Sequence, residues 1–358
     1  MMKVITMTKI AIITDLHLGY HENTNQSKMM YDYLKNFFNF IHDQNIQNVF
    51  ILGDIFDNRE NINFLTIKNT KESFIDPILK YGLNVYIAAG NHDCYYKNTN
   101  DIYSVELLFN HVKNLHLIKN YGENIIIDNT NILMIPWINS QNYEQNMNLI
   151  NNSNADYLMG HFEINGFTMV KGIKCSNGLS KDIFKRFKKV FSGHFHLREN
   201  IGNIYYVGTP YEKDWNDKGS DKGFDILDLE TGNIEFIKNP NNYFEIIEYN
   251  NGLNLDKIEN LQNKEIKLII NSVDKQSKLN ETLNELYKIN VSKLQIIDNT
   301  TIVEEKENLN ESNEMTNLKN DNLEIFKKYI ENLNLDENID KNKLNELLIS
   351  TYNESLSK

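Results

Sequence analysis

The sequence predicts an α/β protein in which a largely parallel or mixed β-sheet is covered by helices on both faces. Short apolar runs alternate along the first half of the chain with segments whose apolar residues recur at helical spacing. This alternation favours crossover connections, which place helices on both sides of a sheet. The chain has 358 residues, more than one average domain, so we expect further units beyond this one.

Apolar runs define the expected strands of the first unit. Buried strands are predicted at residues 10–14, 49–52, 85–89, 157–159 and 190–191, and later strands at 124–128, 132–137, 204–207 and 224–229. Two helices lie between the early strands, marked by two sets of apolar residues: Met30, Leu34, Phe37, Phe38 and Ile41, and then Phe74, Ile78 and Leu79. The unit is expected to span residues 1–240.

Three shorter segments follow. Residues 241–300 are expected to form a small α+β domain, with strands at 266–270 and 294–297 around a helix at 276–287. Residues 301–322 are polar and acidic, which is typical of a flexible linker. Residues 323–358 carry two amphipathic stripes, which predict a helix pair that needs a parent domain or a partner to bury them.

Composition limits the setting of the protein. No apolar run reaches the ~18 residues of a membrane span, and residues 10–13 are too short for a signal peptide. Two cysteines, Cys94 and Cys175, cannot form a disulfide framework, so we expect a reducing, cytoplasmic location. The net charge of −12 argues against a basic nucleic-acid binder, but residues 181–198 hold six basic residues and one acid, and local charge governs steering.

Five of the predicted strands end in loops rich in glycine, histidine and aspartate. The loops are Asp15-Leu16-His17, Gly53-Asp54-Ile55-Phe56-Asp57, Gly90-Asn91-His92-Asp93, Gly160-His161 and Gly193-His194-Phe195-His196. Ligands of open α/β sheets gather beyond the carboxyl ends of the strands, so these loops are expected to converge. Aspartate and neutral histidine suit Mn, Fe or Zn, and a carboxylate such as Asp54 could bridge two ions ~3.5–4 Å apart.

Each loop also has an ordinary structural explanation. Gly-Asp is common in turns, Asn-His-Asp can cap a helix, and a single histidine can be a hydrogen-bonded core residue. Any one motif alone favours that explanation, but five in succession, each after an apolar run, favour a metal site. The other four histidines are interpreted as surface or packing residues: His21, His42, His111 and His116.

The order of these motifs resembles the calcineurin-like metallophosphoesterase superfamily. More narrowly, the chain is similar to the SbcD-type nucleases of DNA break processing, and most of all to the nuclease subunits of T-even phage recombination complexes. The segments 135–137, 160–167 and 207–210 add to this resemblance. It implies a four-layer sandwich of two mixed β-sheets flanked by helices, with a small α+β domain that caps DNA and a C-terminal helix pair.

The resemblance also implies a role for each motif residue. Asp15, His17 and His196 would hold one metal ion; Asn91, His161 and His194 would hold the other; and Asp54 would bridge them. His92 would protonate the leaving oxygen, with Asp57 orienting its ring. The expected cofactor is two Mn²⁺ ions, with Mg²⁺ as the substitute.

The resemblance implies a DNA substrate, with an SbcC-type coiled-coil ATPase as partner and a nuclease homodimer within a heterotetramer; no membrane association is expected. The helix pair would dock the ATPase, although it could instead fold back on its own body. The basic residues Lys185, Arg186, Lys188 and Lys189 are candidate phosphate contacts beside the metals, although a solvated helix face explains them equally well. A phosphoprotein phosphatase or nucleotide phosphodiesterase of the same superfamily is the alternative enzyme, and a non-enzymatic scaffold is the other alternative.

Overall fold

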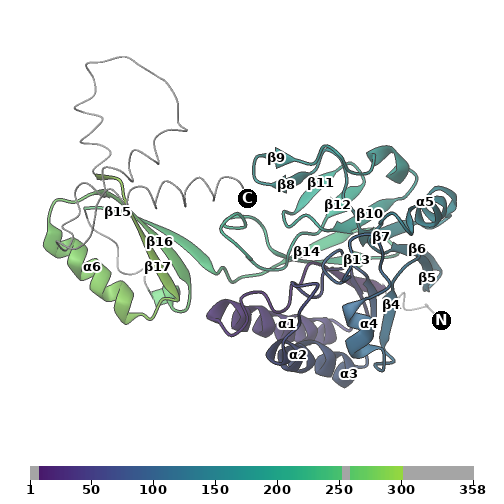
Figure 1. The fold of residues 1–358 in the computed structure, drawn as a ribbon, viewed down its shortest axis with the longest axis horizontal. Coiled ribbons are helices and arrows are strands. Elements are labelled where there is room, and N and C mark those ends of the chain that lie inside the picture. The colour runs from purple at the N-terminus through teal and green to yellow at the C-terminus, as the bar shows by residue number, and fades with distance from the viewer. Residues whose placement is uncertain (1–7, 252–258, 301–358) are drawn as a thin grey trace, which may run out of the picture. The chain divides into compact units, whose positions relative to one another are not determined.

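The computed structural model describes residues 8–251 and 259–300, and the expected linker at 301–322 and helix pair at 323–358 lie outside these ranges. Two six-stranded sheets form the first part of the chain (Figure 1). Within the described residues, no helix is both long enough and apolar enough to cross a membrane.

The first sheet has the order β14-β13-β1-β2-β3-β4. Its parallel part comprises β1 (Lys9–Ile13), β2 (Asn48–Ile51), β3 (Asn84–Ala88) and β4 (Leu115–Ile118). Two antiparallel strands extend it beside β1, namely β13 (Gly223–Asp228) and β14 (Ile234–Lys238). The sheet therefore combines strands from both ends of the first 240 residues.

The second sheet has the order β11-β12-β10-β7-β6-β5. Its parallel core comprises β6 (Thr130–Ile135), β7 (Tyr157–His161), β10 (Lys189–Gly193) and β12 (Ile204–Tyr206). Antiparallel edge strands close it on both sides, β5 (Glu123–Ile127) and β11 (Glu199–Ile201), and a short hairpin of β8 (Thr168–Val170) and β9 (Ile173–Lys174) stands apart.

Alternating burial along the strands produces the layers. On β1, Ile10 and Ile12 belong to the apolar core shared by the two sheets, whereas Ala11 and Ile13 pack into the core beneath the helices. Both faces of β1 are therefore buried, as its continuous apolar run predicts. A third apolar core lies on the outer face of the second sheet, beside α5 (Tyr143–Asn152).

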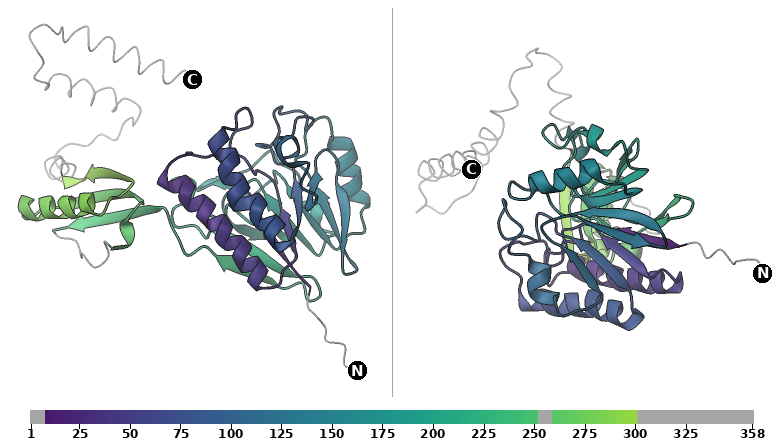
Figure 2. Two further views of the ribbon diagram at one scale, coloured as in Figure 1. Left: turned by 90° about the horizontal axis from the view of Figure 1, so that it is seen from below. Right: turned by 90° about the vertical axis from the view of Figure 1, so that its right-hand side faces the viewer.

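The helices of the first layer pack against the first sheet, as the views in Figure 2 show. They are α1 (Asn25–Asp43), α2 (Phe64–Thr70), α3 (Asp76–Tyr81) and the short α4 (Ser104–Phe109). A π-turn at Lys71–Ile75 joins α2 and α3, so the predicted helix around Phe74 is longer than expected. Phe74 and Ile78 are fully buried, but Leu79 is half exposed and does not belong to the apolar stripe. The class that the resemblance implies, two mixed sheets flanked by helices, is confirmed. The single sheet with helices on both faces is wrong, because one face of each large sheet packs against the other sheet.

A smaller sheet follows β14. Its three strands are parallel and have the order β15-β16-β17: β15 (Phe244–Asn250), β16 (Glu265–Ser272) and β17 (Lys293–Asp298). Helix α6 (Gln276–Lys288) connects β16 to β17, and these three elements agree with the strands and helix expected there. Strand β15 was not predicted. The sheet has a separate apolar core, which includes Tyr249, Leu268 and Leu286.

Candidate metal centre

The five motif loops leave neighbouring strands at their carboxyl ends. Asp15, Asp54 and Asn91 follow β1, β2 and β3, which are adjacent in the first sheet. His161 is the last residue of β7, and His194 follows β10, its neighbour in the second sheet. The motif side chains of both sheets therefore lie together, at the carboxyl ends of the parallel strands.

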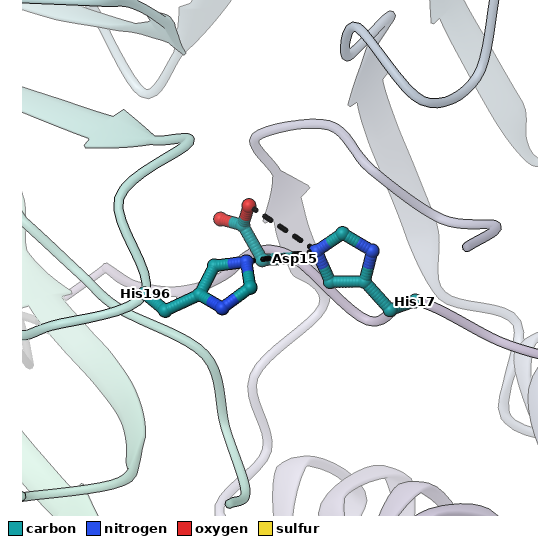
Figure 3. A group of neighbouring side chains, drawn as sticks. All are labelled: Asp15, His17 and His196. Atoms are coloured by element: carbon teal, nitrogen blue, oxygen red, sulfur yellow. Dashed lines mark hydrogen bonds and ion pairs between the residues drawn. The ribbon is translucent and has the colours of Figure 1, made fainter. Parts of the chain in front are cut away.

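The first donor group contains Asp15, His17 and His196, whose ligand atoms lie within 4.8 Å of one another. Figure 3 shows a ring nitrogen of His17 and one of His196 pointing toward each other beside the Asp15 carboxylate. His17 Nε2 lies 3.1 Å from His196 Nε2 and 3.8 Å from Asp15 Oδ1. Two ring nitrogens and a carboxylate oxygen that converge in this way are a typical donor set for a divalent transition metal.

The second donor group is built around the side-chain oxygen of Asn91. His161 Nε2 and His194 Nδ1 each lie 2.9 Å from Asn91 Oδ1. The other ring nitrogen of His161 lies 2.7 Å from the main-chain oxygen of Leu52, which fixes the ring orientation. The sequence-predicted residues Asn91, His161 and His194 are therefore together.

Asp54 lies between the two groups. Its Oδ2 is 3.4 Å from His161 Nε2 and 3.9 Å from His17 Nε2, so one carboxylate oxygen faces a histidine of each group. Its other oxygen accepts a hydrogen bond from the main-chain nitrogen of His92 at 2.8 Å. This is the position that a bridging carboxylate needs.

The electrostatics of the cluster also favour cation binding. Burial raises the pKa of Asp15, whereas His161 holds the pKa of Asp54 well below its usual range despite burial. Burial opposes the charge of His161, but Asp54 and Asp15 outweigh it and raise its pKa to about 9. Burial and the adjacent His161 lower the pKa of His194 to about 3. The buried carboxylates thus favour a positive charge beside them, which His161 carries in this structure and which a bound metal ion would supply instead.

Four of the donor residues have a strained backbone conformation. Asp15, His17, Asp54 and His194 all have positive φ, at 53°, 44°, 54° and 91°. Such conformations are uncommon for non-glycine residues and persist only where the surrounding structure enforces them. A Cβ atom on Gly90 would collide with the Asp54 carboxylate. Glycine is therefore required for the loops to approach this closely.

The geometry corrects the expected role of the Asp57 carboxylate. His92 Nδ1 lies 2.6 Å from the main-chain oxygen of Asp57, so this carbonyl, and not the carboxylate, orients the His92 ring. The carboxylate instead lies 2.7 Å from Lys213 Nζ and 3.3 Å from His17 Nδ1. The Asp57 carboxylate therefore pairs with Lys213 and lies beside His17, a candidate metal ligand.

The basic stretch is not beside the cluster. Lys188 and Lys189 stand at the amino end of β10, whereas His194 follows its carboxyl end, which is ~16 Å away at ~3.3 Å per residue. The expectation that these residues flank the metals is therefore wrong, because the strand separates them. Their side chains have local partners: Lys188 Nζ lies 2.8 Å from Asp156, and Lys189 Nζ lies 3.3 Å from the Tyr205 hydroxyl.

The other two basic residues also contact neighbouring groups. Lys185 Nζ lies 2.7 Å from Asp182 Oδ1, three residues earlier in the chain. Arg186 donates to the main-chain oxygens of Ile150 and Asn151. These contacts hold the stretch against α5 and its own turn.

Three residues near the cluster have structural roles that sequence reasoning did not assign. The fully buried Asp93 carboxylate accepts hydrogen bonds from three main-chain nitrogens of the Asp54 and Asn91 loops, which belong to Ile55, Phe56 and Gly90. Burial and the charge of Asp54 raise its pKa to about 7, against those bonds. The Trp137 ring lies 5.0 Å from that of His194. Asp93 lies in the Gly90-Asn91-His92-Asp93 loop and Trp137 in the segment 135–137, both of which the sequence analysis singled out. The third residue, Lys213, is marked by no feature of the sequence.

Carboxylate, amide and imidazole donors gather at the carboxyl ends of the parallel strands of two mixed sheets. This combination of fold and site is typical of a dinuclear metallophosphoesterase. The chain belongs to the calcineurin-like phosphoesterase family, whose sequence model matches residues 8–198. This confirms the superfamily resemblance and the class of metal-dependent phosphoesterases.

Comparison with individual proteins gives a narrower similarity. The chain is 31% identical over 285 residues to Exonuclease subunit 1 of Enterobacteria phage T4, and the match covers 78% of this chain and 81% of the phage protein. Solved structures that resemble it include an archaeal phosphodiesterase (14% identity, 64% of this chain and 99% of that one, TM-score 0.34). Another is a dimetal phosphatase from Danio rerio (10% identity, 62% and 93%, TM-score 0.40).

Proposed function

We propose that the protein is a metal-dependent DNA exonuclease and endonuclease subunit that hydrolyses phosphodiester bonds in DNA end processing, recombination and replication repair. The observation that carries this proposal is the similarity to a phage protein named as an exonuclease subunit, which extends over 78% of the chain. The family match at residues 8–198 covers only the two large sheets up to β10, so the similarity to the phage protein reaches beyond it.

The two donor groups would hold two divalent ions. Asp15, His17 and His196 would hold one ion, Asn91, His161 and His194 the other, and Asp54 would contact both. Bound divalent ions lower the pKa of water toward neutrality and neutralise charge on phosphoryl oxygens. Mixed imidazole and carboxylate donors suit Mn²⁺ better than Mg²⁺, so we propose Mn²⁺ as the preferred ion and Mg²⁺ as its substitute.

His92 is the proposed proton donor to the leaving oxygen. Because its Nδ1 donates to the main-chain oxygen of Asp57, its Nε2 is the ring nitrogen that remains for proton transfer. The ring lies edge-on to His17, with centroids 5.0 Å apart, which places it beside the first donor group. An alkoxide is a poor leaving group, so protonation by a positioned imidazole accelerates departure.

One assay separates the proposed nuclease from the alternative enzymes. The full-length protein with Mn²⁺ would be given end-labelled duplex DNA, a phosphoserine peptide and a cyclic nucleotide in parallel, with a chelator as the control. We expect chelator-sensitive cleavage of DNA at a much higher kcat/KM than for the other two substrates. Hydrolysis of the phosphopeptide or cyclic nucleotide with DNA left intact would contradict the proposal.

We further propose that the protein acts in the cytoplasm as a homodimer within a heterotetramer, together with an SbcC-type ATPase. The name of the T4 relative, a subunit, supports an assembly. Residues 323–358 are the proposed docking segment, because their two apolar stripes need a covering surface. Deleting them should abolish co-purification with the ATPase while sparing Mn²⁺-dependent hydrolysis of a small phosphodiester. Retained association would remove this segment from the proposal.

A further inference from the structure

A cavity of about 430 Å³ opens beside the metal cluster on the side of the second sheet. Its wall combines aromatic and aliphatic side chains, among them Trp137, Tyr143, Met147 and Phe162, with polar groups. Its volume lies within the ~300–1,000 Å³ range of small-ligand pockets. The roles assigned above to the donor groups and to His92 do not use this space.

The cavity adjoins the second donor group directly. His161, whose Nε2 faces both Asn91 and Asp54, is one of its lining residues. The Trp137 ring lies 5.8 Å from the His161 ring and 5.0 Å from the His194 ring, measured between centroids. A group held in the cavity is therefore a direct neighbour of a phosphate held at the donor groups.

The chemistry of the wall selects a flat, uncharged ligand. Among the described residues that line the cavity, none is lysine or arginine, so the wall offers no cation for a second phosphate. Trp137 and Tyr143 contribute aromatic side chains to the lining, and Glu163, Asn177 and Ser180 contribute polar ones. A planar ring with polar edges satisfies both kinds of surface, and bases commonly stack on aromatic side chains in this way.

The main chain of Trp137 is held in place by hydrogen bonds on both sides. Its main-chain nitrogen donates to the Ala89 oxygen at 2.7 Å. Its main-chain oxygen accepts from the side-chain amides of Asn100 and Asn142, each at 3.0 Å. On the other side, a Cβ on Gly178 would lie 2.5 Å from the main-chain oxygen of Glu163, so only glycine allows that wall to pack this closely. Because such a pocket is already formed, little of the binding free energy is spent on ordering its side chains and loops.

We infer that this cavity receives one nucleobase of the DNA substrate, displaced from the helix beside the phosphate that is cleaved; this inference rests on the proposed nuclease function. Displacing a base costs least where it is terminal, mismatched or unpaired. The pocket therefore favours cleavage next to such a nucleotide over cleavage within a fully paired duplex.

The test compares two ligands that differ only in the base. Binding of deoxyadenosine 5′-monophosphate and of 2-deoxyribose 5-phosphate to the full-length protein with Mn²⁺ would be measured by isothermal titration calorimetry. We expect the nucleotide to bind about 5- to 150-fold more tightly, the affinity ratio that one base–aromatic stack provides. Tyr143→Ala and Trp137→Leu should each reduce this ratio, whereas Tyr143→Phe should keep it. Tyr287→Ala, at an exposed tyrosine of α6, is the matched control.

Equal affinities in the wild-type protein, or a ratio unchanged by both Tyr143→Ala and Trp137→Leu, would overturn the inference. Tyr143 is half exposed at the start of α5, so its replacement tests the pocket without disturbing the core. DNA cleavage by the same preparations separates the two proposals. DNA cleavage together with equal affinities for the nucleotide and the sugar phosphate refutes the pocket alone. Tighter binding of the nucleotide without DNA cleavage supports the pocket and refutes the nuclease.

Discussion

Lys213 Nζ lies 2.7 Å from Asp57 Oδ1, and the same carboxylate oxygen lies 3.3 Å from His17 Nδ1. The main chain of Lys213 is itself fixed: its nitrogen donates to Asp217 and its oxygen accepts from Gln26. Although burial opposes ionisation, His17 and Lys213 hold the pKa of Asp57 below its usual range. The charged Asp57 lies beside the His17 ring nitrogen that faces away from the first donor group, the place from which outer carboxylates orient metal-binding histidines.

Replacing Lys213 should therefore weaken the metal centre from outside it. We expect Lys213→Met to reduce metal affinity or activity by ~10–100-fold, which is typical of changes in groups that orient metal ligands. Lys213→Arg should retain most of it. Metal titration by calorimetry measures the effect, and Lys218→Met is the control, because Lys218 pairs with Glu245. Equal metal affinities in both methionine variants would contradict this role.

Asp54→Asn should weaken both metal ions together. The substitution removes the negative charge that faces His17 and His161, the nearest histidine of each donor group. We expect affinity for both ions to fall by more than ~10-fold, so that dialysed protein retains fewer than two ions per chain. Elemental mass spectrometry gives the stoichiometry, with the exposed Asp101→Asn as the control. A variant that keeps the wild-type stoichiometry would show that Asp54 does not bridge.

His92→Asn should separate proton transfer from metal binding. A ring nitrogen of His92 lies within 4.8 Å of ligand atoms of His17 and Asp57, but His92 belongs to neither of the two donor groups proposed above. We therefore expect metal affinity to stay near the wild-type value. Turnover of DNA should fall by ~10²–10⁴, the usual contribution of one acid–base group. Steady-state kinetics and calorimetry on the same protein check both parts, and the exposed His111→Asn is the matched control. Loss of metal binding would instead identify His92 as a ligand.

Lys188 and Lys189, two of the candidate phosphate contacts, lie at the opposite end of β10 from His194. If Lys188 and Lys189 contact phosphates, Lys188→Glu with Lys189→Glu should flatten the slope of log K against log salt by about two units, at ~0.9 per phosphate contact. Hydrolysis of a small phosphodiester should not change, because β10 separates these residues from the cluster. Lys68→Glu, at another exposed and paired lysine, is the control. An unaltered slope would exclude both residues from DNA binding.

Much of the fold follows from local patterns in the sequence. Buried parallel strands such as β1 and β2 are continuous apolar runs, and the stripe on α1 has helical period, so both can be located without tertiary information. Strand β15 was missed because only Phe244 and Tyr249 of its seven residues are buried. It lacks both a continuous apolar run and strict alternation.

The donor residues could be predicted because strand order and strand direction bring them together. Each follows an apolar run, and the carboxyl ends of neighbouring parallel strands meet at one edge. The same reasoning places Lys188 and Lys189 at the opposite end of β10, since Lys188 precedes this strand and Lys189 begins it, whereas His194 follows it. Lys213 could not be found in this way, because it lies in the loop between β12 and β13, whose course depends on tertiary contacts.

Through its carboxylate, Asp93 joins the loop that carries Asp54 to the loop that carries Asn91, and replacing Asp93 tests this connection. Its carboxylate accepts from the main-chain nitrogens of Ile55 at 2.8 Å, Phe56 at 3.1 Å and Gly90 at 3.0 Å. An asparagine has one acceptor oxygen in place of two, so Asp93→Asn turns an amide donor toward at least one of these buried donors. Leaving a buried polar group unsatisfied costs about 1–3 kcal/mol.

We therefore expect Asp93→Asn to lower the free energy of unfolding of the chelated protein by about 1–3 kcal/mol, measured by urea denaturation. Chelation removes the contribution of bound metal, so the change reports on the loops themselves. Asp101→Asn, at an exposed aspartate, should stay within about 0.5 kcal/mol of the wild-type protein. An unchanged midpoint in Asp93→Asn would mean that the Asp54 and Asn91 loops hold their positions without this carboxylate, and that the strained donors are supported by the sheets alone.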